Sequence, residues 1–151
     1  MEAGKLYRSA HLSESRLEAY VEKYGIKTIV NLMDDLESDR AVAARKGLTY
    51  VANRCDQLPT QEAVDLFLAV MDEKKNHPVL VHCEHGIGRS ALVGLCILVD
   101  RGWSPIEALT LAKDAPLVGS LVGETPWPRD ASLAAILRDG RVIVPAPDIA
   151  M

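Results

Sequence analysis

The spacing of apolar residues along this chain changes repeatedly between the pattern of a strand and that of a helix. Short apolar runs predict strands near residues 6–8 and at 28–33, 48–51 and 78–82. Between and after them, the pattern predicts helices at 14–24, 41–46, 61–75, 89–101 and from 104 onward. Strands that alternate with helices are typical of a layered α/β domain. We therefore expect a central, mostly parallel sheet of four to five strands flanked by helices.

Capping residues mark several of these boundaries. Ser13 and Thr60 are predicted to cap the helices that follow them, and Ser104 to Glu107 has the residues of a capping box. Residues 78–82 are apolar without alternation, as in a strand that is buried on both faces. The segment 89–101 is apolar nearly all round, so we expect this helix to be central.

The pattern fades beyond Asp114, where prolines and glycines interrupt the chain. Residues 130–139 are the remaining candidate helix, and residues 141–151 are expected to be an exposed tail. The sequence thus predicts one domain over residues 1–140, followed by a C-terminal tail over residues 141–151.

The composition of the chain argues against several classes of function. The chain has 151 residues, 48% of them hydrophobic, which suits one packed core. Its net charge is −4, without a basic segment, and aromatic residues make up 5%, so we expect neither nucleic acid nor a membrane as partner. The longest uncharged apolar stretch, residues 90–99, is too short to span a bilayer, and residues 1–5 do not resemble a signal peptide. We therefore expect a cytoplasmic protein.

One segment, residues 82–90 (HCEHGIGRS), carries the residue types that nucleophilic chemistry on a bound oxyanion requires. It lies between the predicted buried strand and the predicted central helix. A loop in that place points successive backbone N–H groups inward and adds the positive end of the helix dipole. The expected anion-binding residues are Glu84, His85, Gly86, Ile87, Gly88 and Arg89.

The cysteine of this segment is the candidate nucleophile. Cys83 would face the positive potential of the loop, which favours the thiolate and lowers the pKa of the cysteine. The planar fork of Arg89 can bind two oxygens of a phosphate group. Ser90 places a hydroxyl beside the sulfur, where it can stabilise the thiolate as a leaving group, and His82 is expected to make a buried hydrogen bond that supports the loop.

The H-C-x5-R-S segment resembles the signature of the cysteine-based protein phosphatases, the tyrosine and dual-specificity superfamily. Residues 6–10 and 25–32 look like the opening of small bacterial members of the dual-specificity-like branch, and the resemblance extends from residue 5 to about residue 114. It implies a protein-tyrosine-phosphatase-like fold and a phosphomonoester hydrolase that forms a cysteinyl-phosphate. It also implies that no cofactor and no metal are needed.

The resemblance further implies a general acid on a separate loop, because the leaving oxygen must be protonated. Asp56 follows a predicted strand and precedes the helix that leads back to the motif strand, so we favour it. Asp34 and Asp35 are the alternatives, since they also follow a strand and would lie on the same edge of the sheet. Many relatives carry a glutamine-containing loop that places water for the second step, and this chain has no glutamine after Gln61. Either another group serves, or the second step is slow.

Three functions remain open on the sequence. The first is a dual-specificity or tyrosine phosphatase acting on phosphorylated protein. The second is a phosphatase for a small metabolite, lipid or RNA phosphate ester; the loop has no lysine and contains Glu84, which argues against polyphosphoinositides. The third is a weakly catalytic phosphate-binding module, although the loop shows no defect.

Several residues near the motif have simpler interpretations. Cys96 is expected in the core, and Cys55 is expected to pack rather than to form a disulfide with Cys83. A zinc site formed by the motif histidines is not favoured, because only two histidines remain elsewhere in the chain. Arg8 is expected to face solvent and His85 to lie at the rim, while Glu84 either orients water or faces solvent.

Overall fold

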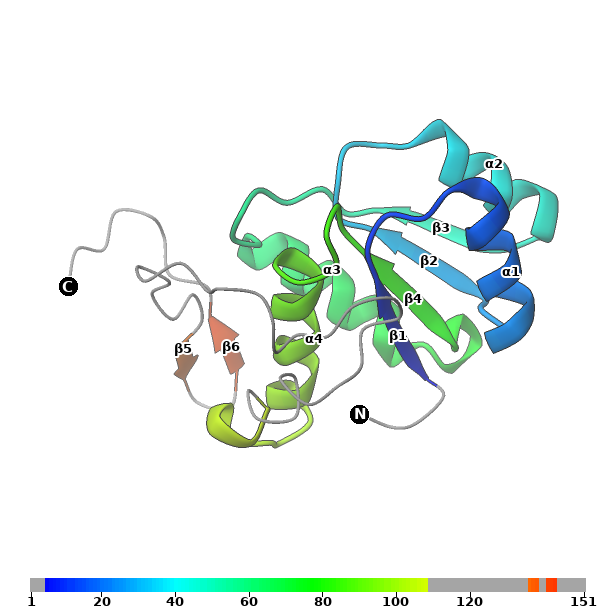
Figure 1. Cartoon of the computed structure of the whole chain (residues 1–151). Coiled ribbons are helices and arrows are strands. Elements are labelled where there is room, and N and C mark those ends of the chain that lie inside the picture. Colours follow the sequence, from blue (N-terminus) through cyan, green and yellow to red (C-terminus); the bar gives the residue numbers. More distant parts are fainter. Residues whose placement is uncertain (1–4, 109–135, 139–140, 144–151) are drawn as a thin grey trace.

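The computed structural model describes residues 5–108, 136–138 and 141–143. Its central sheet has four parallel strands in the order β1-β4-β2-β3. The strands are β1 (Leu6–Ser9), β2 (Thr28–Asn31), β3 (Thr49–Ala52) and β4 (Val79–His82). Figure 1 shows helices on both sides of this sheet. The predicted α/β class and the parallel sheet are confirmed.

In the part of the chain that the structure describes, four α-helices flank the sheet. They are α1 (Glu14–Tyr24), α2 (Glu37–Lys46), α3 (Gln61–Asp72) and α4 (Arg89–Asp100), and a short 3-10 helix, η1 (Lys74–Asn76), follows α3. Helices α1 and α2 cover one face of the sheet, and α3 and α4 cover the other (Figure 1). Residues 105–108 are also helical, and Ser104 and Glu107 make the predicted capping box, with the Ser104 amide donating to the Glu107 carboxylate over 3.0 Å.

Strand β4 lies between the two largest apolar clusters of the described core. Val79 and Val81 pack with Phe67 and Val93 on the side of α3 and α4. Leu80, between them in the sequence, packs on the side of α1 and α2. All four residues of β4 are buried, which explains why this strand shows no polar alternation.

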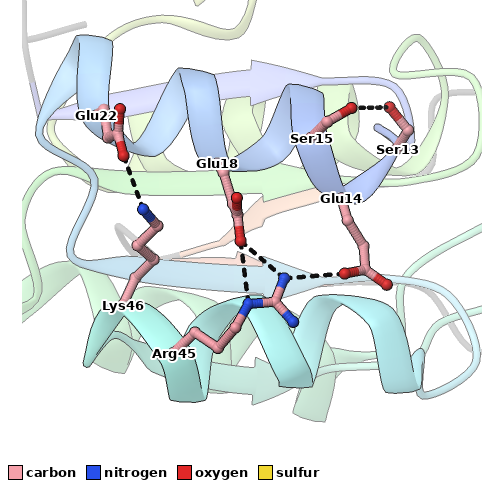
Figure 2. A network of polar contacts seen from close by, with 7 residues as sticks. All are labelled: Ser13, Glu14, Ser15, Glu18, Glu22, Arg45 and Lys46. Atoms are coloured by element: carbon pink, nitrogen blue, oxygen red, sulfur yellow. Dashed lines mark hydrogen bonds and ion pairs between the residues drawn. The ribbon is translucent and has the colours of Figure 1, made fainter.

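The two helices on one face are also joined at the surface. Figure 2 shows Arg45 of α2 between Glu14 and Glu18 of α1, at N–O distances of 2.9 and 2.7 Å. Lys46 donates to Glu22 over 2.7 Å. These side chains are 31–68% exposed, and exposed ion pairs contribute little to stability. The network therefore joins α1 to α2 at the surface and adds little to the stability of the fold.

The structure corrects several expectations about single elements. The side chain of Ser13 makes no capping bond at the start of α1, whereas the Thr60 hydroxyl accepts from the Ala63 amide over 3.2 Å, as expected. Helix α2 begins at Glu37, four residues before the predicted start. The prediction missed the first turn because that turn is polar and carries no apolar periodicity.

The predicted helix at residues 130–139 is wrong where the structure describes it. Residues Ile136–Arg138 form strand β5, which pairs antiparallel with strand β6 (Arg141–Ile143). The pairing of these two strands replaces the helix at the described positions. Strand β6 lies in the segment that we expected to be a tail, and the rest of residues 130–151 lies outside the described residues. Within the described ranges, no helix has the length and apolar character needed to cross a membrane.

Candidate active site

The register of the sheet brings three chain segments together beside Cys83. In the sheet, Ser9 of β1 and Asn31 of β2 both lie opposite His82, the last residue of β4. The segments that follow these parallel strands therefore meet at one edge, where α/β proteins place their ligands. The loop 83–88 leaves β4 at this edge and enters α4 at Arg89.

This loop is packed closely against the end of β1. Gly86 has a φ of +74°, and a Cβ atom built there would lie 2.5 Å from the amide nitrogen of Ala10 and 2.7 Å from the carbonyl carbon of Ser9. The amide of His11 donates to the carbonyl of Glu84 over 3.1 Å. Glycine is needed at position 86 for both its backbone conformation and the close approach.

Cys83 lies at the bottom of the loop. Its residue is 2% exposed, and its Sγ lies 3.3 Å from the hydroxyl oxygen of Ser90. Burial raises the pKa of the Cys83 thiol, but hydrogen bonds from the Ser90 side chain and from the amides of Ser90 and Gly86, with the charge of Arg89, outweigh it. The pKa of Cys83 is thereby lowered below its ordinary value, which favours the thiolate.

Arg89 is held above the sulfur by the two neighbouring loops. Its Nη1 donates to the carbonyl oxygens of Leu32, over 3.2 Å, and of Cys55, over 3.3 Å. Its Nη2 lies 3.8 Å from the carboxylate of Glu84. The guanidinium side chain is 23% exposed, so it is anchored yet still accessible from the cleft.

A cleft of about 510 Å³ opens above this cysteine. Its lining residues come from the motif loop and from the loop after β3: Asp56, Gln57, Cys83, Glu84, His85, Ile87, Gly88 and Arg89. Gly86 and Ser90 are not among these lining residues. Gly86 packs against the end of β1, and the Ser90 hydroxyl contacts the sulfur of Cys83. Gln57 was not a candidate on the sequence, because no pattern around it indicates that its side chain lines a cleft.

The three candidate acids occupy different positions. Asp56 lines the cleft and is exposed over 91% of its side chain, with Arg54 at 3.8 Å. Asp34 lies 2.9 Å from Nε of the same Arg54. Asp35 pairs with Arg40 and accepts a hydrogen bond from the Tyr50 hydroxyl over 3.0 Å. Neither Asp34 nor Asp35 belongs to the described lining of the cleft, which favours Asp56.

His82 points away from the cleft. Its Nε2 lies 2.9 Å from Oδ2 of Asp39 in α2, and both side chains are buried. Neither ring nitrogen makes a hydrogen bond among the described residues, so the buried hydrogen bond expected of His82 is wrong there, and a close contact with a carboxylate takes its place. Asp39 was missed on the sequence, although it precedes the buried Val42 and Ala43 by three and four positions. This spacing places it on the inner face of α2 and could have indicated a buried carboxylate.

The remaining candidates are placed as follows. Burial raises the pKa of Cys55 and of Cys96 to about 11 each, so both thiols stay protonated at neutral pH. Arg8 is half-buried rather than facing solvent, and burial lowers its pKa while the nearby charge of Cys83 opposes that shift. His85 is largely exposed at the rim, 3.9 Å from Glu84. Within residues 5–108 and the two short strands, no group of three or more metal-ligating side chains is close enough to hold a metal ion.

A parallel sheet with a buried cysteine in an amide-lined loop, followed by an arginine at the start of a helix, defines the fold and site of the cysteine-based phosphatases. The chain belongs to the family Tc-R-P, described as polymorphic toxin system, DSP-PTPase phosphatase, whose model matches residues 4–103. The resemblance stated from the motif is thus confirmed.

Known proteins agree with this assignment. The dual specificity protein phosphatase TpbA of Pseudomonas aeruginosa is 29% identical over 107 residues, which cover 69% of this chain and 48% of TpbA. The chain thus spans about half the length of this curated relative. A crystal structure of TpbA in complex with phosphotyrosine is 25% identical, with a TM-score of 0.58, and covers 75% of this chain and 69% of that one.

A third likeness concerns the fold alone. The core catalytic domain of the PP-IP phosphatase SIW14 from S. cerevisiae, solved in complex with citrate, is 18% identical, with a TM-score of 0.64. The match covers 72% of this chain and 69% of that one.

Proposed function

We propose that this chain is a phosphomonoester hydrolase that acts on phosphorylated protein through a cysteinyl-phosphate at Cys83. One observation carries the proposal: a cysteine with a lowered pKa lies in a cleft that it shares with Arg89. The relative TpbA was crystallised with phosphotyrosine, which supports a phosphotyrosine or dual-specificity substrate.

The first step would be an in-line attack of the Cys83 thiolate on phosphorus. The amides of the loop and the guanidinium of Arg89 bind the phosphoryl oxygens and stabilise the charge of the transition state. The bond between phosphorus and the ester oxygen breaks, and Asp56 donates a proton to that oxygen. The product is a phosphoryl group bound to sulfur, together with a free alcohol or phenol.

The second step would hydrolyse this intermediate. Asp56, now a carboxylate, accepts a proton from a water molecule that attacks phosphorus, and the bond from sulfur to phosphorus breaks. The Ser90 hydroxyl, 3.3 Å from Sγ, donates to the thiolate as it leaves. Gln57 lines the same cleft, and in this proposal its side-chain amide contacts that water.

The charges around the cleft support a singly phosphorylated substrate. Glu84 and Asp56 both line it, and the cation nearest Asp56, Arg54, is also paired with Asp34. Carboxylates at the rim repel further phosphate groups on a substrate. We therefore favour a phosphoprotein over a polyphosphorylated lipid or metabolite. A cytoplasmic location without nucleic-acid or membrane partners remains part of this proposal.

The test compares Cys83→Ser with Cys96→Ala on p-nitrophenyl phosphate and on phosphotyrosine and phosphoserine peptides. Cys96 is buried in α4, away from the cleft, so its substitution controls for the loss of a buried thiol. Turnover should fall to background in the Cys83 variant and persist in the Cys96 variant. Activity confined to small metabolite esters would shift the substrate class, and turnover by Cys83→Ser would refute the proposal.

A further inference from the structure

A buried carboxylate–imidazole pair lies directly behind the active-site loop. Asp39 is in the first turn of α2, and His82 is the last residue of β4. The side chains of His82 and Asp39 are 3% and 2% exposed, and Nε2 of the one lies 2.9 Å from Oδ2 of the other. A buried ionisable group is costly unless it is paired, and this close contact offsets part of that cost for both residues.

The pair lies on the face of the sheet opposite the cleft. Along β4, Val81 belongs to the core on the side of α3 and α4, and Leu80 to the core on the side of α1 and α2. Because side chains alternate along a strand, His82 points toward α2, whereas Cys83 points toward the cleft. Asp39 therefore contacts no substrate, and any effect on catalysis must pass through His82.

His82 is coupled to the loop through its backbone. Its carbonyl accepts the amide of Leu32 over 3.0 Å, and its peptide bond leads directly into Cys83. A shift of the His82 residue would therefore be passed to Cys83 and would change the distance of Sγ from the Gly86 and Ser90 amides that stabilise the thiolate.

In the described part of the chain, Asp39 is the side chain paired with this ring, at 2.9 Å. Neither ring nitrogen of His82 makes a hydrogen bond among those residues, and Oδ2 of Asp39 makes none, so the contact between them is a close polar approach of 2.9 Å. The aromatic neighbour of His82 is His11, with ring centroids 6.1 Å apart. The ionisable groups that face His82 are thus Asp39 from α2 and His11 from the segment after β1. Those that act on Cys83 from its own side of the sheet are Arg8, Cys55 and Arg89.

We propose that Asp39 is a positioning residue for the phosphatase reaction, which holds the His82 imidazole and thereby keeps the Cys83 sulfur at the focus of the loop amides. The inference rests on the proposed function, because it assigns the pair to the same nucleophile. It adds a residue from α2, a helix that contributes nothing to the lining of the cleft.

The experiment compares Asp39→Ala with Val42→Ala. Val42 is fully buried one turn further along α2, and its truncation removes packing on the same helix face without changing a polar contact. Two measurements are made on each variant: kcat and KM for p-nitrophenyl phosphate, and the rate of alkylation of Cys83 by iodoacetamide as a function of pH. Burial keeps Cys55 and Cys96 protonated in the neutral range, so Cys83 dominates that alkylation.

We expect Asp39→Ala to lower kcat by about 10- to 100-fold with a smaller change in KM, as for a misplaced nucleophile. The pH midpoint of Cys83 alkylation should rise, because the amide hydrogen bonds to the thiolate weaken. Val42→Ala should leave the pH midpoint of Cys83 alkylation unchanged, even if it lowers the melting temperature as much as Asp39→Ala does. If Asp39→Ala does not fold, Asp39→Asn, which keeps the shape without the charge, should change both measurements in the same direction.

A double-mutant cycle with His82→Ala separates this role from a general loss of stability. If Asp39 acts through His82, Asp39→Ala should change kcat little in the His82→Ala background. Additive losses in the cycle, or an alkylation midpoint that matches Val42→Ala, would overturn the inference. A wild-type protein that hydrolyses no phosphate ester would instead refute the proposed function.

Discussion

Substitution of Gly86 by alanine tests how tightly the active-site loop is packed against β1. The backbone at this position has a φ of +74°, which costs an L-residue about 1–2 kcal/mol. The new Cβ would also lie 2.5 Å from the Ala10 nitrogen and 2.7 Å from the Ser9 carbonyl carbon. Both are backbone atoms of a segment fixed by the sheet, so the overlap adds about 1–3 kcal/mol. We therefore expect Gly86→Ala to lower the free energy of unfolding by roughly 2–5 kcal/mol.

Two matched substitutions separate the cost of the backbone conformation from the cost of the steric overlap. Gly47 has a φ of +67° but open space around its Cβ position, so Gly47→Ala should cost only the backbone term, about 1–2 kcal/mol. Gly94 is inside α4 with open space, so Gly94→Ala should stabilise by about 0.5–1 kcal/mol. Urea unfolding of the three variants measures these differences. A Gly86→Ala variant that loses no more stability than Gly47→Ala would refute the packing argument.

Three further predictions concern the chemistry. Asp56→Asn should slow hydrolysis of phenyl phosphate more than that of p-nitrophenyl phosphate, because the poorer leaving group needs the proton. Equal losses on both substrates, or a larger effect of Asp34→Asn, would contradict Asp56 as the general acid. The lowered pKa of Cys83 predicts that kcat/KM reaches its thiolate plateau below the pH at which an ordinary cysteine ionises. Ser90→Ala should move the rising part of this pH profile to higher pH, because it removes a hydrogen bond that lowers the pKa of Cys83. A pH profile that Ser90→Ala leaves unchanged would contradict that role of Ser90. Arg89→Lys should lower kcat/KM by about 10²–10³-fold through loss of oriented donors, and a variant within a few-fold of wild type would contradict this role.

Much of the fold followed from the sequence because the central strands are buried. Val79 to His82 are buried on both faces, and such a strand is a continuous apolar run that needs no tertiary information to be found. The motif loop was predictable for a related reason, since its glycines and arginine sit at fixed spacing between that strand and a helix. Proximity of Asp56 to the cleft could be predicted as well, because parallel strands place their following loops on one edge.

Other features depend on contacts that the sequence does not specify. The pairing of Asp39 with His82 requires α2 to lie over the end of β4, and these residues are far apart in the chain. Ser13 has the side chain of a cap, yet its hydroxyl lies near that of Ser15, at 3.4 Å, instead of bonding to the helix amides. Residues Ile136–Arg138 have helical propensity, but pairing with β6 determines their conformation.

The covalent intermediate tests the central claim most directly. The wild-type protein is mixed with p-nitrophenyl phosphate, quenched with acid within the first turnovers, digested and analysed by mass spectrometry. The account predicts one added phosphoryl group on the peptide that contains Cys83, and none on the peptides of Cys55 and Cys96. Turnover that proceeds without any phosphoryl group on Cys83, in a sample quenched before the steady state, would contradict it.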